Sequence, residues 1–195
     1  MRWVFRIALV AFAATSFAVG GWPLAEKPTA PSPSANGQRP TANEITIPVA
    51  GVTGDSLKPT FDQARAGHVH HALDILAPRG TPVVAAVDGT IRKLFTSRAG
   101  GITIYQFDGD ETFVYYYAHL DRYALGIREG IGVKRGEVIG YVGTTGNAPA
   151  RTPHLHFAIA RLPDGKEWWK GEAIDPYPIL TTPASAPPTL ASGTD

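Results

Sequence analysis

Histidine has the most informative spacing in this sequence of 195 residues, which holds six of them. His154 and His156 flank one apolar residue in the run Pro153-His154-Leu155-His156-Phe157. Side chains at positions i and i+2 of a strand share a face, so both imidazoles are expected to point the same way. Two imidazoles on one face are able to converge on a single metal ion.

A further histidine stands four residues before a carboxylate, in the run His70-His71-Ala72-Leu73-Asp74. In a strand, His70 and Asp74 share a face, and the small Ala72 leaves the space between them open. The same spacing would suit one face of a helix. The prolines and glycine of residues 78–82 follow too soon for a helix, so the pattern favours a strand.

His119 ends a third candidate strand, in which alternation places Tyr115, Tyr117 and His119 on one side. The sequence has no cysteine, so any metal must bind through nitrogen and oxygen. Two histidines and one aspartate supply the three protein ligands of a catalytic zinc site, which leaves a fourth position for water. No HExxH motif is present, which excludes a thermolysin-type site.

The chain resembles the M23 peptidases, which are lysostaphin-like zinc endopeptidases of peptidoglycan. The resemblance rests on residues 70–83, 117–120, 140–147 and 153–157, which occur in the family's order. Two departures are visible. Ala72 stands where the family usually has glycine, and residues 148–152 replace its Ser-Thr-Gly stretch, which bears on loop shape and substrate preference.

The resemblance implies a Zn²⁺ ion held by His70, Asp74 and His156, with His119 and His154 as unligated catalytic histidines. One of the catalytic pair would accept the proton of the attacking water and deliver it to the leaving amine. The other would donate a hydrogen bond to the developing oxyanion. The sequence leaves open which histidine has which role.

Several neighbouring side chains are assigned secondary roles. Tyr117 and Arg151 are candidate substrate contacts, the second through a substrate carboxylate. His68 is expected to be a solvated loop residue, and His71 a packing or groove-wall residue. Trp168 and Trp169 are expected to pack against residues 174–178, with sugar stacking as the alternative.

The function implied is a metalloendopeptidase that cleaves peptide cross-links or stem peptides of peptidoglycan. The bond is either a D,D linkage or a glycine-rich bridge. The alternative is a non-catalytic member of the family that activates a cell-wall amidase. Such members usually lack a ligand or a catalytic histidine, whereas this chain retains all five positions, so the enzyme is favoured. A monomer is expected.

The body of the chain reads as short strands separated by turns, because 21 glycines and 17 prolines accompany alternating or β-branched runs. The strands are predicted at 44–49, 73–76, 83–87, 90–95, 101–107, 112–120, 138–142 and 155–161. Only 61–66 and 122–125 are candidate helices. The predicted fold class is mostly β, a compact antiparallel domain, and the resemblance specifies a barrel-sandwich hybrid with a duplicated hybrid motif.

The two ends differ in composition from the body. Residues 1–22 are predicted to be a signal peptide or an N-terminal signal anchor, residues 23–43 a proline-rich linker, and residues 181–195 a disordered tail. Either reading of residues 1–22 exports the peptidase domain, residues 44–180, to the periplasm or the extracellular space. A membrane tether is therefore one of the two expectations.

The net charge of the chain is +1, from 18 basic and 17 acidic residues. Four of these bases and two of these acids lie outside residues 44–180, which leaves that domain with 14 basic and 15 acidic residues. A net charge so close to zero is not typical of a domain built around a basic groove for nucleic acid.

Overall fold

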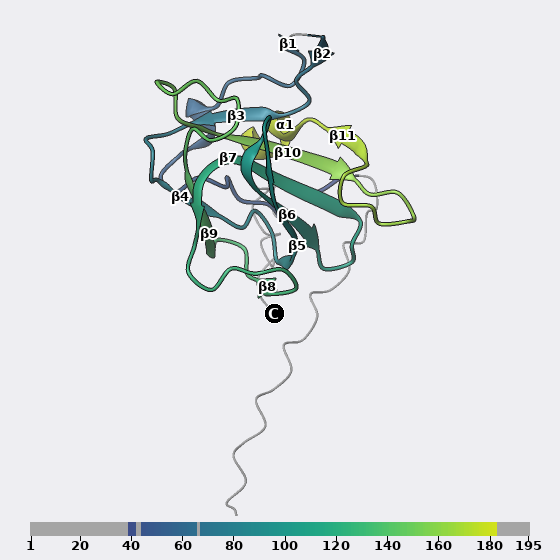
Figure 1. Ribbon diagram of the computed structural model, residues 1–195. Coiled ribbons are helices and arrows are strands. Elements are labelled where there is room, and N and C mark those ends of the chain that lie inside the picture. Colours follow the sequence, from purple (N-terminus) through teal and green to yellow (C-terminus); the bar gives the residue numbers. More distant parts are fainter. Residues whose placement is uncertain (1–38, 42–43, 66, 183–195) are drawn as a thin grey trace, which may run out of the picture.

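The computed structural model describes residues 39–41, 44–65 and 67–182 (Figure 1). The predicted signal segment 1–22, most of the linker and residues 183–195 lie outside the described residues. Within the described part of the chain, no helix is long and apolar enough to cross a membrane.

Antiparallel strands make up most of the domain, which confirms the predicted fold class. The strands are β1 (Ala64–Arg65), β2 (His68–Val69), β3 (Leu73–Leu76), β4 (Pro82–Val84), β5 (Gly89–Ser97), β6 (Gly101–Asp108), β7 (Phe113–Tyr123), β8 (Gly132–Val133), β9 (Val138–Val142), β10 (His154–Arg161) and β11 (Glu172–Ile174). A 3₁₀ turn, η1 (Gly54–Ser56), and one short helix, α1 (Pro176–Thr181), complete the described elements.

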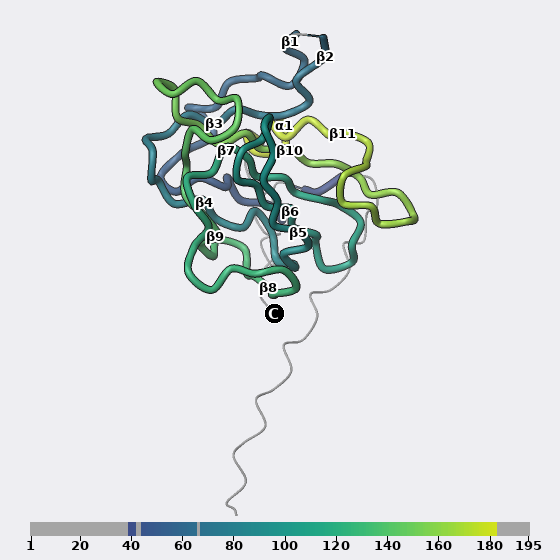
Figure 2. The backbone as a smooth tube through the Cα atoms, viewed as in Figure 1, coloured from purple at the N-terminus to yellow at the C-terminus, as the bar shows by residue number. Residues whose placement is uncertain are grey.

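A nine-stranded sheet positions the functional residues, with the main order β11-β10-β7-β6-β5-β8. β3 also pairs with β10, and β9 joins β4 to β7. β10 therefore lies between β3 and β7, so that His156 stands opposite both Asp74 and Ala118. β1 and β2 form a separate hairpin, which stands out from the body in Figure 2.

The alternation along β10 separates the core from the functional face. Leu155, Phe157 and Ile159 are buried in the main hydrophobic core, whereas His154 and His156 occupy the opposite face. Tyr115 and Tyr117 of β7 join the core from the neighbouring strand. The predicted period-two pattern of β10 is thus confirmed.

The helix predictions were wrong. Residues 61–66 include β1, and residues 122–123 continue β7. The α-helix that the structure describes begins instead after Asp175, whose side chain accepts a hydrogen bond from the backbone nitrogen of Tyr177 at 3.0 Å. Pro176 occupies its first turn, so an Asp-Pro start signal was present in the sequence and was missed.

Two predicted strands are shorter than expected. Residues 44–49 form only an isolated bridge, between Val49 and Val83, and β4 ends at Val84. By contrast, β3 and β9 have the predicted bounds, and β6 is one residue longer than predicted.

Candidate metal centre

A cavity of about 640 Å³ opens at the ends of β3, β7 and β10. Its lining includes all five residues that the sequence singled out for metal binding or catalysis: His70, Asp74, His119, His154 and His156. Tyr116 and Ala118 of β7 and residues of the loop before β10 complete much of the wall. The residues predicted to act together therefore share one cavity, although they are as much as 86 positions apart in the chain.

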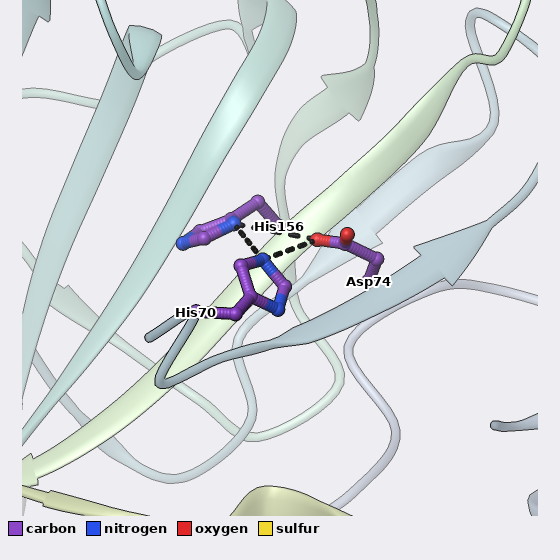
Figure 3. Close-up of side chains that lie close together, drawn as sticks. All are labelled: His70, Asp74 and His156. Atoms are coloured by element: carbon purple, nitrogen blue, oxygen red, sulfur yellow. Dashed lines mark hydrogen bonds and ion pairs between the residues drawn. The ribbon is translucent and has the colours of Figure 1, made fainter. Parts of the chain in front are cut away.

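His70, Asp74 and His156 point toward one another (Figure 3). His70 Nε2 lies 3.0 Å from His156 Nδ1 and 3.1 Å from Asp74 Oδ1, and His156 Nδ1 lies 3.3 Å from Asp74 Oδ1. Ligands at the usual zinc distances of 2.0–2.1 Å in a tetrahedron stand about 3.3 Å apart. The spacing of the three atoms therefore suits a small divalent cation.

Asp74 Oδ1 provides an independent test of this fit. Among the described residues, this oxygen is the one buried side-chain oxygen or nitrogen atom that has no hydrogen-bond partner. Buried polar atoms are nearly always satisfied, because desolvation without a partner costs roughly 1–3 kcal/mol or more. A cation bound between Oδ1 and the two imidazoles would satisfy this oxygen, so the residues present fit a metal.

Thr60 orients two of the three candidate ligands, although no motif in the sequence pointed to it. Its carbonyl lies 3.0 Å from His70 Nδ1, which leaves His70 Nε2 facing Asp74 and His156. Its hydroxyl accepts a hydrogen bond from the backbone nitrogen of Asp74 at 3.0 Å and donates one to the carbonyl of Ala72. Burial lowers the pKa of His70, which favours the neutral form that binds metals.

Arg65, in the β1–β2 hairpin, is a second contact that sequence reasoning missed. Its Nη2 donates to Asp74 Oδ2 at 2.7 Å, so the oxygen that faces away from the histidines is held by a charged partner. Arg65 and His68 both line the cavity. His68, which was expected to be a solvated loop residue, is thus an exposed residue of β2 at the cavity rim.

A β-bulge brings His119 into the cavity. Ile104 pairs with Tyr117 and Ile102 pairs with Leu120, so two residues of β7 stand opposite one residue of β6. His119 has a φ of 61°, in the left-handed region that non-glycine residues seldom adopt, and its backbone nitrogen donates to the carbonyl of Gly100.

The bulge overturns the predicted facing of β7. His119 lines the cavity with Tyr116 and Ala118, whereas it was expected on the side of Tyr117. Tyr117 is 0% exposed; its hydroxyl donates to Gln106 Oε1 and accepts from the backbone nitrogen of Ala86. The prediction that Tyr117 contacts substrate is therefore wrong, and Tyr116 occupies the position expected for it.

His119 and His154 are both buried and lie side by side, with ring centroids 5.0 Å apart. His119 Nδ1 is 2.9 Å from the carbonyl of Thr145, and His154 Nδ1 is 2.8 Å from the carbonyl of Thr152. When such a ring is neutral, its Nδ1–H donates to that carbonyl and its Nε2 carries the lone pair. Burial, aided by the nearby His156, lowers the pKa of His119 to about 4.

The remaining predicted residues have mixed outcomes. Arg151 is exposed, and although its neighbours Pro149 and Thr152 line the cavity, Arg151 does not, so its contact with substrate stays a prediction. His71 packs edge-on against Phe61 with ring centroids 5.2 Å apart, which agrees with the packing role. Trp168 packs against Phe95 and Tyr105 of the sheet.

The sequence is similar to a known protein family and to several characterised proteins. The profile of "Peptidase family M23" matches residues 68–176. An L-Ala–D-Glu endopeptidase of Bacillus subtilis is 34% identical over 145 residues, which are 70% of this chain and 43% of the relative. The DD-carboxypeptidase/endopeptidase Mpg of Neisseria meningitidis is 39% identical over 120 residues, 59% of this chain and 24% of the relative.

A solved structure shows the same likeness. The catalytic domain of the antimicrobial peptidase lysostaphin from Staphylococcus simulans superposes with a TM-score of 0.52 at 30% identity, covering 65% of this chain and 90% of that domain. The chain spans less than half the length of the two curated relatives above.

Proposed function

The chain belongs to peptidase family M23, and from this premise we propose that it is a zinc endopeptidase that hydrolyses peptide bonds of bacterial peptidoglycan. The observation that carries the proposal is the buried Asp74 Oδ1, which has no hydrogen-bond partner and lies within 3.3 Å of two imidazole nitrogens. This arrangement fits a ligand set of His70, Asp74 and His156.

When bound there, Zn²⁺ supplies Lewis acidity, which polarises an amide carbonyl and activates water for attack at neutral pH. The chain's own residues hold the cation and manage the protons. Thr60 and Arg65 fix the orientation of His70 and Asp74 through the contacts described above. Two imidazoles and one carboxylate carry a single negative charge, which leaves a net positive site to attract a polarised carbonyl.

We assign the role of proton acceptor to His119. Its pKa of about 4 keeps the ring neutral at pH 7, and its Nδ1–H is engaged by the carbonyl of Thr145, so Nε2 is available to take a proton. His154 then takes the other role. In its doubly protonated form, with the second proton taken from solvent, it donates from Nε2 to the oxygen on which negative charge develops, while Nδ1–H stays on the Thr152 carbonyl.

The substrate assignment rests on the relatives, which are named an L-Ala–D-Glu endopeptidase, a DD-carboxypeptidase/endopeptidase and, in Vibrio cholerae, a peptidoglycan DD-endopeptidase. We place the protein outside the cytoplasm for this reason, with residues 1–22 as signal peptide or membrane anchor, residues 23–43 as linker, residues 44–180 as peptidase domain and residues 181–195 as tail. The bond that is cleaved is either a D,D linkage or a glycine-rich bridge, and the masses of the digestion products distinguish the two.

The test is digestion of purified peptidoglycan by the full chain, followed by mass spectrometry of the released muropeptides. We expect cleavage that stops when the metal is chelated and resumes when zinc is added. Asp74→Ala is expected to lose zinc, whereas His119→Ala is expected to keep zinc and lose at least about 100-fold in rate. His71→Ala, outside the ligand set, is the control.

Three outcomes would contradict the proposal. Cleavage that survives chelation would remove zinc from the mechanism, and a His119→Ala protein with full rate would remove its role. A wild-type protein that binds no zinc, cleaves nothing and stimulates an amidase would be the non-catalytic regulator.

A further inference from the structure

Five aromatic side chains form a continuous row that begins at the metal centre: Tyr116, Tyr105, Trp168, Trp169 and Phe95. Tyr116 packs edge-on against His156 with ring centroids 5.9 Å apart, and Tyr105 follows at 4.6 Å from Tyr116. Trp168 lies 4.6 Å from Tyr105 and contacts both Trp169, at 5.1 Å, and Phe95, at 5.7 Å.

This aromatic row lies on the face of the sheet that carries His156. Tyr105 pairs directly with Tyr116 across β6 and β7, and Tyr116 stands opposite Ala158 of β10. Ala158 and Ala160 are small and partly exposed, so β10 places little bulk beside the rings. The row therefore continues the cavity wall along the sheet, because Tyr116 belongs to both.

The outer end of the row is open to solvent. Trp169 is 60% exposed and Phe95 is 42% exposed, and no other tryptophan or phenylalanine in the described part of the chain is exposed to this degree. Both belong to this one cluster. Exposed apolar surface that gathers in one place usually marks a binding site, whereas scattered single residues need no explanation.

The chemistry of the row matches a neutral, amphipathic ligand. None of its five side chains is charged at neutral pH, and burial raises the pKa of Tyr105, which keeps that phenol protonated. Lys93, next to Tyr105 in the β5–β6 pairing, is held by Glu129 at 2.8 Å. Exposed, uncharged aromatic rings suit a sugar, which presents C–H bonds on one face of its ring.

A peptide suits this surface less well. β6, β7 and β10 are interior strands whose backbone groups pair with neighbours on both sides. An extended peptide laid on the face of a sheet gains no ladder hydrogen bonds, whereas one added at an edge does. A saccharide needs no such ladder, because it can stack on the exposed rings of Trp169 and Phe95.

We propose that the aromatic row is a saccharide-binding surface that holds a glycan strand of N-acetylated hexosamines beside the metal centre. The inference rests on the proposed function, since a stem peptide bound in the cavity is covalently attached to such a strand. Sugar rings stack on Trp169 and Phe95, and the row guides the strand so that the attached peptide enters past Tyr116.

The probe is a preparation of peptide-free glycan strands, titrated calorimetrically onto the full chain with the metal chelated. Because no hydrolysis is required, failure of the zinc mechanism would leave this result unaffected. We expect saturable binding that Trp169→Ala weakens about fivefold or more, which corresponds to the loss of roughly 1 kcal/mol of aromatic contact. Phe95→Ala should weaken binding in the same direction.

Leu125→Ala is the matched control, because Leu125 is 104% exposed and contacts no member of the row in the pairs above. Thermal unfolding of every variant checks that the fold is intact. The proposal is overturned by strands that do not bind, or by equal affinity in wild type and Trp169→Ala. Loss of vesicle binding instead of glycan binding in Trp169→Ala would assign the row to a membrane, and loss of binding to glycan-free stem peptides alone would assign it to peptide.

Discussion

The two carboxylate oxygens of Asp74 have different partners, and the difference determines how this residue can serve a metal. Oδ1 faces His70 and His156, and Oδ2 accepts from Arg65 at 2.7 Å. A carboxylate held at one oxygen presents the other in a fixed direction, which favours binding through a single oxygen. Arg65 also brings a positive charge close to the site, which repels a cation.

Replacing Arg65 separates these opposed effects. Arg65→Met removes the hydrogen bond and the charge, and we expect zinc affinity to fall about tenfold, the low end for an outer-shell contact, because the side chain is 39% exposed. Arg65→Lys keeps the charge but loses the planar fork, so it should also bind zinc more weakly than wild type. Competition with a chromophoric chelator measures both affinities. Tighter binding by the Met variant would show that charge repulsion outweighs orientation.

The bulge in β7 brings His119 into the site. Its geometry depends on the close approach of Gly101 to Thr145 and Gly146. Gly101 has a φ of 66°, and a Cβ added there would overlap Thr145 and the backbone nitrogen of Gly146. The carbonyl of Thr145 is the partner of His119 Nδ1, and the Thr145 hydroxyl accepts from the backbone nitrogen of Ile102. The close approach of these two loops therefore fixes the ring that we assign as proton acceptor.

Gly101→Ala is expected to destabilise the domain by roughly 2–4 kcal/mol, since it combines an unfavourable φ with a clash against backbone. Gly130→Ala is the matched control: its φ is 81°, but an added Cβ would meet nothing within 4 Å. That variant should lose only about 1 kcal/mol. Chemical denaturation measures both, and equal losses would mean that the Gly101 contact is not tight.

The sequence was informative where the strands are regular and misleading where they are not. His154-x-His156 lies in an unbroken stretch of β10, so its shared face followed from local alternation. The facing of His119 did not follow, because a bulge is a property of the pairing with β6 and leaves no mark in β7 alone. His70 precedes β3, and its position depends on the Thr60 carbonyl, which is ten residues away.

Charge in the whole domain is nearly balanced, so a long-range electrostatic field contributes little to the glycan binding that we propose, which depends instead on local contacts such as the aromatic row. Two carboxylates have pKa values that are lowered by hydrogen-bond donors in direct contact with them. The backbone nitrogen of Arg135, together with Lys134, lowers the pKa of Asp88, and Arg79 with Arg122 lowers that of Asp121. These carboxylates are ionised in both folded and unfolded chains above pH 5.

Asp108 behaves in the opposite way, and its effect on stability opposes that of His119, whose lowered pKa makes stability rise with pH between about 4 and 6.5. Asp108 lies at the end of β6 away from the bulge, and burial, aided by Asp110, raises its pKa from 3.8 to about 7. The folded chain therefore keeps a proton that the unfolded chain has already released. This contribution to stability is complete below pH 3.8 and is lost as the pH rises through 7.

Asp108→Asn cannot ionise, yet its amide oxygen can still accept from the backbone nitrogens of Thr112 and Phe113, as the carboxylate does at 2.8 and 2.9 Å. We expect the variant to gain stability over wild type as the pH rises from about 4 to 7 and the gain to level off above pH 7, because the histidine contributions are the same in both proteins. At pH 8 it should be more stable by about 2 kcal/mol, roughly half of the full linkage value because the carboxyl is partly solvated.

Urea denaturation at several pH values measures this profile, with Asp55→Asn as a surface control that leaves the slope unchanged. Identical slopes for wild type and Asp108→Asn would refute the assignment. The β6–β7 turn lies far along the sheet from His119, so zinc affinity and hydrolytic rate at pH 7 should match wild type once both proteins are folded.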